Sequence, residues 1–342
     1  MLFTRILFEQ TVKRKKMNMR RYCQNINDGW PTIQALRKSG IASIPLRIQG
    51  PACGVTPPAE IVLDPDATDI PLYGHQPERF FHGYYDSYCY LPLYIFCGDQ
   101  LLCARLRPAN QDAAAGSIEE ASRIVTQLRA CWPAVKIVLR VDSGFCREQL
   151  MAWCEANQVD YVLGLARNKR LAKIIGGPIE QARVLHQTTG KAARVFAGFD
   201  YQTCKSWSRP RRVVAKAEYL DKGENPRFVV TSLTPDRWPD QDLYEKFYCA
   251  RGEMENRIKE QMCLFADRLS TDEMKGNQLR LYFSALAYTL MEALRRLAHK
   301  SSPSNPRYRP RRAAFAQLST VLKKISFIFS VEGILSLGIA VG

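Results

Sequence analysis

IVLDPDATD, at residues 61–69, is an apolar run that acidic side chains interrupt. Side chains two positions apart share one face of a β-strand, so Asp64 and Asp66 would project together while Leu63 points to the other face. Two neighbouring anions on a buried face repel each other, and burying either one unpaired costs several kcal/mol. A hard divalent cation, magnesium or manganese, would balance their charge. The alternative interpretation is a turn at Pro65, or a cap for a following helix.

The composition favours an intracellular protein with a polyanionic partner. The chain has 342 residues and a formal net charge of +16, from 49 lysines and arginines against 33 aspartates and glutamates. Such a charge is typical of proteins that bind nucleic acid. The 11 cysteines are scattered without zinc-site spacing, which indicates reduced thiols. The apolar run at residues 325–342 contains Glu332, Gly333 and Gly338, so we expect no membrane span there.

A second acidic position follows another strand pattern. KIVLRVDSGF, at residues 136–145, is rich in β-branched residues and reaches Asp142 just before a Gly-containing turn, after which REQLMAWCEAN predicts a helix. The carboxyl end of a strand before such a turn is where α/β folds carry functional groups. The alternative is that Asp142 only caps the next helix.

The segments around these two stretches predict an α/β order. YCYLPLYIF at 88–96 and LLCARL at 101–106 predict a hairpin, Ser117 to Glu120 has the form of a capping box, and YVLGLA at 161–166 predicts a further strand. The expected order is β-β-β-α-β-α-β. Residues 175–240 indicate a β-rich insertion instead. Its basic and aromatic residues suit contacts with DNA backbone and bases, although an ordinary exposed sheet face has similar residues; they include Trp207, Arg211 and Arg212.

A third candidate carboxylate lies on a predicted helix. In YCARGEMENRIKEQMCLF, at residues 248–265, Tyr248, Arg251 and Glu255 share one helical face, and Lys259 lies one turn further along it. Glu255 presented toward two strand-end aspartates would complete a cage of three carboxylates, with Arg251 placed to hold Glu255 or to touch a phosphate. The alternative is an exposed helix stabilised by ion pairs between neighbouring turns.

The combination of these elements resembles the DDE transposases of bacterial insertion sequences, and more narrowly the branch that carries a Y-x2-R-x3-E-x6-K signature. The resemblance extends from about Pro58 to about Lys300, and the motifs that carry it are DATD, GHQ, FHGYYDSYCYLPLYIF, VDSGF, RRVVAK, RFVVTSL and YCARGEMENRIKE. It implies an α/β fold with an RNase H-like catalytic core, in which a mixed sheet combines antiparallel hairpin strands with parallel strands between flanking helices. The β-rich insertion would precede the helix that carries the glutamate.

The resemblance also implies a site. Asp66, Asp142 and Glu255 would be catalytic and would ligate two Mg²⁺ or Mn²⁺ ions, with Asp64 as the rival for the first position. Tyr248 and Arg251 match the signature and would contact phosphates at the transposon end. The remaining candidate contacts with DNA are Lys259, Arg211, Arg212 and, more weakly, Trp207 as a stacking residue in the insertion.

The implied function is metal-dependent strand cleavage and strand transfer on double-stranded DNA, with the terminal repeats and the target as substrates and a homodimer in synapsis. The expected location is the bacterial cytoplasm, at the nucleoid, without a membrane. Two alternatives are a structure-selective nuclease of the same fold and a DNA-binding relic with impaired catalysis.

Some features depart from the family pattern. Met262 stands where the signature has lysine. Residues 1–57 and 301–342 look unrelated to the family, and these two ends predict a truncated or rearranged copy with impaired recognition of DNA ends. The expected domains are a basic segment at 1–57, the core at 58–174, the β-rich insertion at 175–240, core helices at 241–300 and an atypical tail at 301–342.

Overall fold

A computed structural model describes residues 58–300, and the side chains of residues 58–295. The chain divides into two compact units, and the first of them contains the described residues up to Glu292. The elements below belong to the first of these units, apart from the last residues of the final helix. The predicted basic segment 1–57, the tail 301–342 and the apolar run in it lie outside the described residues.

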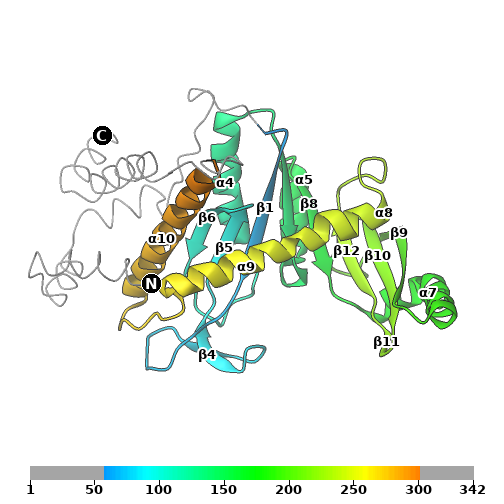
Figure 1. Cartoon of the computed structure of the whole chain (residues 1–342), viewed down its shortest axis with the longest axis horizontal. Helices are drawn as coiled ribbons and strands as arrows, with labels where there is room; N and C mark the ends of the chain where they lie inside the picture. The colour runs from blue at the N-terminus through cyan, green and yellow to red at the C-terminus, as the bar shows by residue number, and fades with distance from the viewer. Residues whose placement is uncertain (1–57, 301–342) are drawn as a thin grey trace, which may run out of the picture. The chain divides into compact units, whose positions relative to one another are not determined.

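Within residues 58–300, nine strands form one mixed sheet (Figure 1). Their order is β11-β10-β12-β8-β7-β1-β5-β6, with β9 paired to β10. Strands β1, β7 and β8 are parallel neighbours, whereas β5, β6 and β12 pair antiparallel. The strands are β1 (Glu60–Ala67), β5 (Leu93–Cys97), β6 (Gln100–Arg105), β7 (Lys136–Val141), β8 (Asp160–Leu165), β9 (Ala193–Tyr201), β10 (Arg211–Leu220), β11 (Gly223–Glu224) and β12 (Arg227–Thr231).

Strand β1 runs through both aspartates, so the alternative of a turn at Pro65 is wrong. Leu63 packs in the core on one face of the sheet, and Asp64 and Asp66 lie on the other, as the alternation predicts. Pairing of β1 with β7 covers Glu60–Leu63, while Pro65 faces only β5. The missing N–H of Pro65 therefore leaves the ladder with β7 intact.

The predicted hairpin is confirmed as β5 and β6, which turn at Gly98 with a φ of 54°. The run 88–96 is nevertheless divided at Pro92, and its first part joins a separate sheet of three strands among the described residues. That sheet consists of β2 (Ile70–Pro71), β4 (Ser87–Tyr90) and β3 (Phe80–His82).

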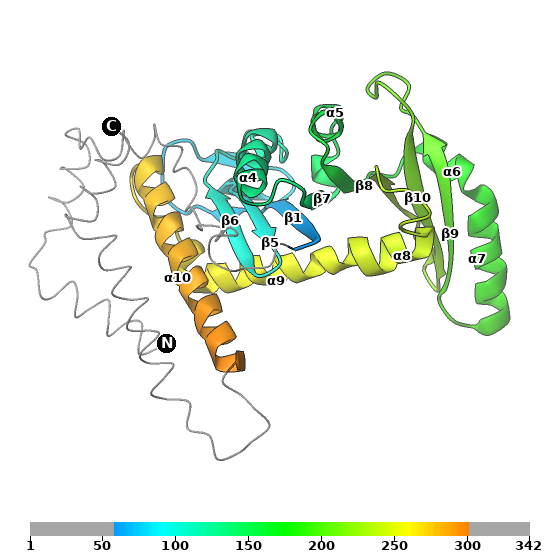
Figure 2. The ribbon, with the colours of Figure 1, turned by 90° about the horizontal axis from the view of Figure 1, so that it is seen from above.

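Helices cover both faces of the large sheet. Figure 2 shows α4 (Ser117–Cys131) and α5 (Glu148–Ala156) on the face opposite to α9 (Gly252–Gln261). The predicted capping box of α4 does not form, because Gly116 is the N-cap with a φ of 74° and the Ser117 hydroxyl donates to the Ala114 carbonyl at 2.6 Å. Short α6 (Lys169–Ile174) and α7 (Gly176–Thr189) follow β8.

Residues 175–240, the predicted insertion, hold α7 and then β9 to β12. Phe228 on β12 pairs with Leu165 on β8, so these strands continue the sheet of the core. A long helical stretch begins at Asp240, after a loop that follows β12, and is interrupted only near its end, at Leu264 and Phe265; Figure 1 shows it crossing the sheet. It comprises α8 (Asp240–Asp242), the π-helical turn η3 (Leu243–Tyr248), the 3-10 turn η4 (Cys249–Arg251), α9 and a second π-helical turn η5 (Met262–Ala266).

The last described helix is α10 (Met274–Lys300). Its residues Leu281, Ala285 and Tyr288 pack with Phe96 of the hairpin and Ile258 of α9 in one apolar cluster. None of the helices in residues 58–300 is long and apolar enough to cross a membrane. The described chain is thus a mixed α/β fold with hairpin strands, parallel strands and flanking helices, which is the architecture predicted with the RNase H-like class.

Candidate active site

Two of the predicted carboxylates meet because β1 and β7 are parallel and in register. Leu63 is opposite Leu139, so Asp66 and Asp142, each three residues further along, lie at the same end of neighbouring strands. Asp142 directly precedes a 3-10 turn, and its Oδ1 accepts a hydrogen bond from the Gly144 amide at 2.9 Å. Asp142 therefore caps this short turn through one oxygen, whereas the N-cap of α5 is Arg147, so Asp142 is not the cap of that helix that the alternative proposed.

Arg251 brings the three predicted carboxylates together. Its Nη2 lies 3.4 Å from Asp66 Oδ1 and 3.6 Å from Asp142 Oδ2, and its Nη1 lies 3.0 Å from Glu255 Oε1. The Arg251 side chain is only 13% exposed. The guanidinium is thus a buried cation shared by residues from β1, from the end of β7 and from α9.

Electrostatics at this point favour a positive charge. Burial raises the pKa of Asp66 to about 7, and repulsion from Asp142 and Glu255 adds to the effect, while Arg251 opposes it. Burial works against the charge on Arg251, but Asp66 and Asp142 together raise its pKa. One guanidinium therefore does not fully compensate the acidic cluster.

Asp64 has a different environment although it shares the strand face with Asp66. The two oxygens of Asp64 accept hydrogen bonds from Nε and Nη2 of Arg140 at 2.7 and 2.8 Å. Nη1 of Arg140 donates to the Phe247 carbonyl at 2.6 Å. Asp64 is 2% exposed, and burial raises its pKa against the opposing effect of Arg140. Its carboxylate is therefore committed to an internal ion pair.

The hydroxyl of Tyr248 lies next to Gly164 on β8, at the same end of the sheet. A Cβ atom on Gly164 would lie 2.5 Å from the Tyr248 hydroxyl and 2.7 Å from the Ser143 amide nitrogen. Burial raises the pKa of Tyr248 to about 12, with a contribution from Asp142. The hydroxyl consequently stays protonated at neutral pH and can donate a hydrogen bond next to the carboxylates.

The structure does not bring the predicted contacts of the insertion to this site. Arg211 is buried between Glu148 and Glu155, with hydrogen bonds of 2.7 Å to each, and Arg212 binds Asp240 and two backbone carbonyls. Trp207 is 7% exposed and packs edge-on against Tyr201. We therefore correct the prediction for these three residues, because their polar and aromatic groups already have partners inside the protein.

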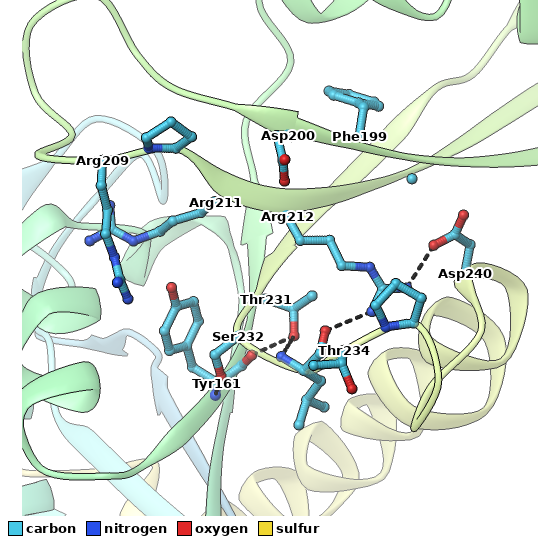
Figure 3. Close-up of a pocket in the computed structure, with 14 residues that line it drawn as sticks. Tyr161, Phe199, Asp200, Arg209, Arg211, Arg212, Thr231, Ser232, Thr234 and Asp240 are labelled. Atoms are coloured by element: carbon cyan, nitrogen blue, oxygen red, sulfur yellow. Dashed lines mark hydrogen bonds and ion pairs between the residues drawn. The ribbon is translucent and has the colours of Figure 1, made fainter.

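A pocket of about 550 Å³ lies beside these arginines (Figure 3). Figure 3 shows Arg212 directed at Asp240 across the pocket, and the Thr231 hydroxyl donates to the Tyr161 carbonyl at 2.8 Å. The residues that line the pocket include none of the three carboxylates gathered at Arg251. We therefore place the candidate site at Arg251 and not in the pocket.

Two further predicted positions lie on or after α9. Lys259 is exposed one turn beyond Glu255, where a solvent-facing cation can meet DNA. Met262, which replaces the signature lysine, packs against the apolar cluster between the hairpin and α10. That position accordingly contributes to apolar packing in this chain, partly buried beside the cluster.

Sequence reasoning missed two residues of the site, Arg140 and Gly164. Arg140 lies two residues before Asp142, so the alternation that places Asp64 with Asp66 also places Arg140 on their face. A cation at that strand position was the available signal. Gly164 interrupts an apolar strand, and an isolated strand glycine often marks a close approach of another backbone.

The donor set fits a hard divalent cation. In the described part of the chain, no group of three His, Cys, Asp or Glu side chains is already arranged around a metal position. Asp66, Asp142 and Glu255 instead surround a guanidinium, and oxygen donors of this kind are those that magnesium and manganese prefer. A divalent metal ion in place of the Arg251 guanidinium would bring two positive charges instead of one to this acidic cluster.

Comparison with known proteins gives a family and similarity to solved structures. The family model described as transposase DDE domain group 1 matches residues 33–325, which extends past the predicted limits of the resemblance at both ends. No curated protein is detectably similar to the chain. A solved piggyBac transposase, in a synaptic complex with hairpin DNA, is 12% identical with a TM-score of 0.43; the match covers 82% of this chain and 57% of that one. The chain therefore spans little more than half the length of that transposase.

Proposed function

The chain belongs to the transposase DDE domain group 1 family, and from this we propose that it cleaves DNA strands and transfers the cut ends to a target. The observation that carries the proposal is the convergence of Asp66, Asp142 and Glu255 on Arg251. Asp66 is buried, and a buried carboxylate with two further carboxylates around the same guanidinium is costly unless a reaction or a bound cation uses it.

Asp66, Asp142 and Glu255 are proposed to hold two Mg²⁺ or Mn²⁺ ions, in keeping with the general use of divalent metals by DDE transposases. When bound, such ions supply activation of a water or a 3′-hydroxyl and stabilisation of the leaving oxygen. Asp64 has its two oxygens on Arg140, so we assign it a positioning role instead of metal ligation.

The remaining residues of the site would act on the phosphate. Arg251 is the cation nearest to the carboxylates, and once it is released from them its planar fork can bind two phosphate oxygens. The protonated hydroxyl of Tyr248 can donate to the same group. Lys259, exposed one turn beyond Glu255, would contact the backbone of the same DNA.

The proposed chemistry conserves the number of P–O bonds in each step. In cleavage, a water oxygen forms a bond to phosphorus, the bond to the 3′-oxygen breaks, and a free 3′-hydroxyl remains. In strand transfer, that hydroxyl attacks a target phosphate and displaces another 3′-oxygen. Neither step needs an oxidant or a nucleotide cofactor, so the site has only to position and polarise the reactants.

The proposed substrates are double-stranded DNA at the ends of the mobile element and target DNA. A net charge of +16 supports binding to a polyanion. Two copies of the chain would pair the two ends in synapsis.

The test is a nicking and strand-transfer assay on DNA that carries the ends of the flanking element, with magnesium or manganese. The wild type is compared with Asp142→Ala and Glu255→Ala, and with Asp66→Asn and Asp64→Asn to separate the two aspartates of β1. Loss of both activities with retained DNA binding in the Asp142 and Glu255 variants supports the proposal. Nicking without strand transfer would instead indicate a nuclease, and binding without nicking by the wild type would indicate a relic.

A further inference from the structure

A dense basic surface follows β8, and none of the residues assigned to the candidate site belongs to it. Residues 166–174 contain Arg167, Lys169, Arg170 and Lys173 and no acidic residue. All four basic side chains are exposed. We call residues 167–173 the basic segment.

The basic segment lies at the same end of the sheet as the carboxylates. Strands β7 and β8 are parallel, and Val141 is opposite Leu163, so Gly164 is the neighbour of Asp142. The segment begins three residues beyond Gly164. At about 3.3 Å per residue this is roughly 10 Å past the carboxylate end of β7. That distance is within reach of the next phosphates on a DNA strand held at Asp142.

The backbone of the basic segment is fixed to the core, so its charges have defined positions. Asn168 caps α6 by accepting from the Leu171 amide at 3.0 Å, and Leu171 is fully buried. The Arg170 guanidinium lies 5.2 Å from the ring centre of Tyr201 and donates to the Gln202 carbonyl.

The charges of the segment are largely uncompensated. Among the described residues, no acidic side chain forms an ion pair with Lys169 or Lys173, and Arg167 is 3.8 Å from a half-exposed Glu224. Four like charges in such a short segment repel one another, which an anionic ligand would relieve.

The opposite flank of the site has the reverse charge. Residues 68–90, which follow β1, contain three acidic side chains, Asp69, Glu78 and Asp86, against the single arginine Arg79. Their exposed surface is aromatic, with Tyr73 and Tyr84 more than 80% exposed at 94% and 85%. A duplex backbone laid across the sheet end therefore meets attraction on the β8 side and repulsion on the β1 side.

We propose that the basic segment 167–173 binds the phosphate backbone of duplex DNA beside the bond to be cut, so that the duplex leaves the site on the β8 side. The proposal rests on the proposed function for the identity of the polyanion as DNA. Contacts of lysine with phosphates are independent of sequence, so the segment would position the DNA and not select it.

The test measures binding of a 30-base-pair duplex by fluorescence anisotropy without divalent metal, over a series of NaCl concentrations. The variant Lys169→Gln/Lys173→Gln is compared with the wild type. Each lost phosphate contact makes the slope of log K against log salt shallower by about 0.9, so we expect a change of about 1.8 for the pair. Both lysines are exposed, so thermal melting should be unchanged.

The matched control is Lys136→Gln, because Lys136 is an exposed lysine at the start of β7, at the other end of the strand from Asp142. Its salt slope should equal that of the wild type. Equal slopes for the wild type and the double variant, or the same change per charge in the control, would overturn the proposal. Nicking by the wild type is scored separately: its failure counts against the proposed function, whereas the slopes alone decide the role of the segment.

Discussion

The guanidinium of Arg140 holds both carboxylate oxygens of Asp64, at 2.7 and 2.8 Å, two residues before Asp66 on β1. The third hydrogen bond of Arg140, to the Phe247 carbonyl at 2.6 Å, joins this pair of strands to the helical stretch that carries Arg251. Arg140 therefore links the strand that carries Asp64 and Asp66 to the helical stretch that carries Arg251.

The two aspartates of β1 should respond differently to neutralisation. Asp64→Asn leaves Arg140 buried with a weakened partner, and breaking a buried pair costs about 3–5 kcal/mol. Asp66→Asn removes a charge that burial and Asp142 disfavour, so stability should fall little or rise while strand cleavage is lost. Urea denaturation and nicking assays on both variants measure this, and an unstable Asp66→Asn with a stable Asp64→Asn would contradict it.

Replacing the whole ion pair separates stability from positioning. The apolar variant Asp64→Leu/Arg140→Met should recover most of the stability lost in Asp64→Asn, because well-packed apolar groups often replace a buried pair at no cost. It lacks the bond to the Phe247 carbonyl, so cleavage should stay below wild type by tenfold or more, at about 1.4 kcal/mol per factor of ten. Wild-type cleavage in this variant would show that the bond to Phe247 is unnecessary.

Local periodicity predicted the strands of the sheet, whereas the resemblance to DDE transposases singled out the three carboxylates that the structure gathers at Arg251. Alternation along β1 put Asp64 and Asp66 on one face but could not rank them, since the difference lies in Arg140 on another strand. The register of β1 with β7 decides it. Arg211 shows what local patterns miss. The basic and aromatic residues around it suited contacts with DNA, but its partners Glu148 and Glu155 come from a helix some 60 residues earlier in the chain.

Arg251 should compete with divalent cations for the carboxylates. Removing its charge with Arg251→Gln eliminates both the repulsion of an incoming cation and the contacts to Asp66 and Glu255. Binding of Mn²⁺, followed by electron paramagnetic resonance, should become several-fold tighter, while DNA cleavage falls because the phosphate loses its guanidinium. Arg257→Gln, on the same helix but paired with Asp99 and Glu260, is the control and should leave Mn²⁺ affinity unchanged.

Acid should weaken the link between α5 and β10. Burial disfavours the charged form of Glu155, but hydrogen bonds from Arg211 and Arg209 outweigh this and lower its pKa to about 2. A carboxyl group with a lowered pKa in the folded state stabilises the protein fully above its unfolded value of 4.5, and this stabilisation is lost as the pH falls from there toward 2.

Glu155→Gln should therefore cost stability at pH 7 and progressively less at lower pH. Chemical denaturation of the wild type and the variant between pH 7 and pH 3 measures the difference. A gap that is constant over this range would contradict the linkage, since a merely steric defect does not depend on pH.

Gly164 should be intolerant of even one methyl group, although its backbone conformation is an ordinary one. The added Cβ of Gly164→Ala would stand 2.5 Å from the Tyr248 hydroxyl and 2.7 Å from the Ser143 amide nitrogen, so either the tyrosine or the turn after Asp142 must move. Overpacking of this kind costs about 1–3 kcal/mol.

Adding Tyr248→Phe to Gly164→Ala distinguishes the two ways of relieving the clash. If the hydroxyl is the main obstacle, the double variant regains stability relative to Gly164→Ala alone. If the Ser143 backbone is the obstacle, stability stays low and cleavage falls further, because the displaced turn carries Asp142. Gly83→Ala, where no atom lies within 4 Å of the new Cβ, is the control and should match the wild type in urea denaturation. Equal stability of Gly164→Ala and Gly83→Ala would mean that β8 does not approach the site as closely as the structure indicates.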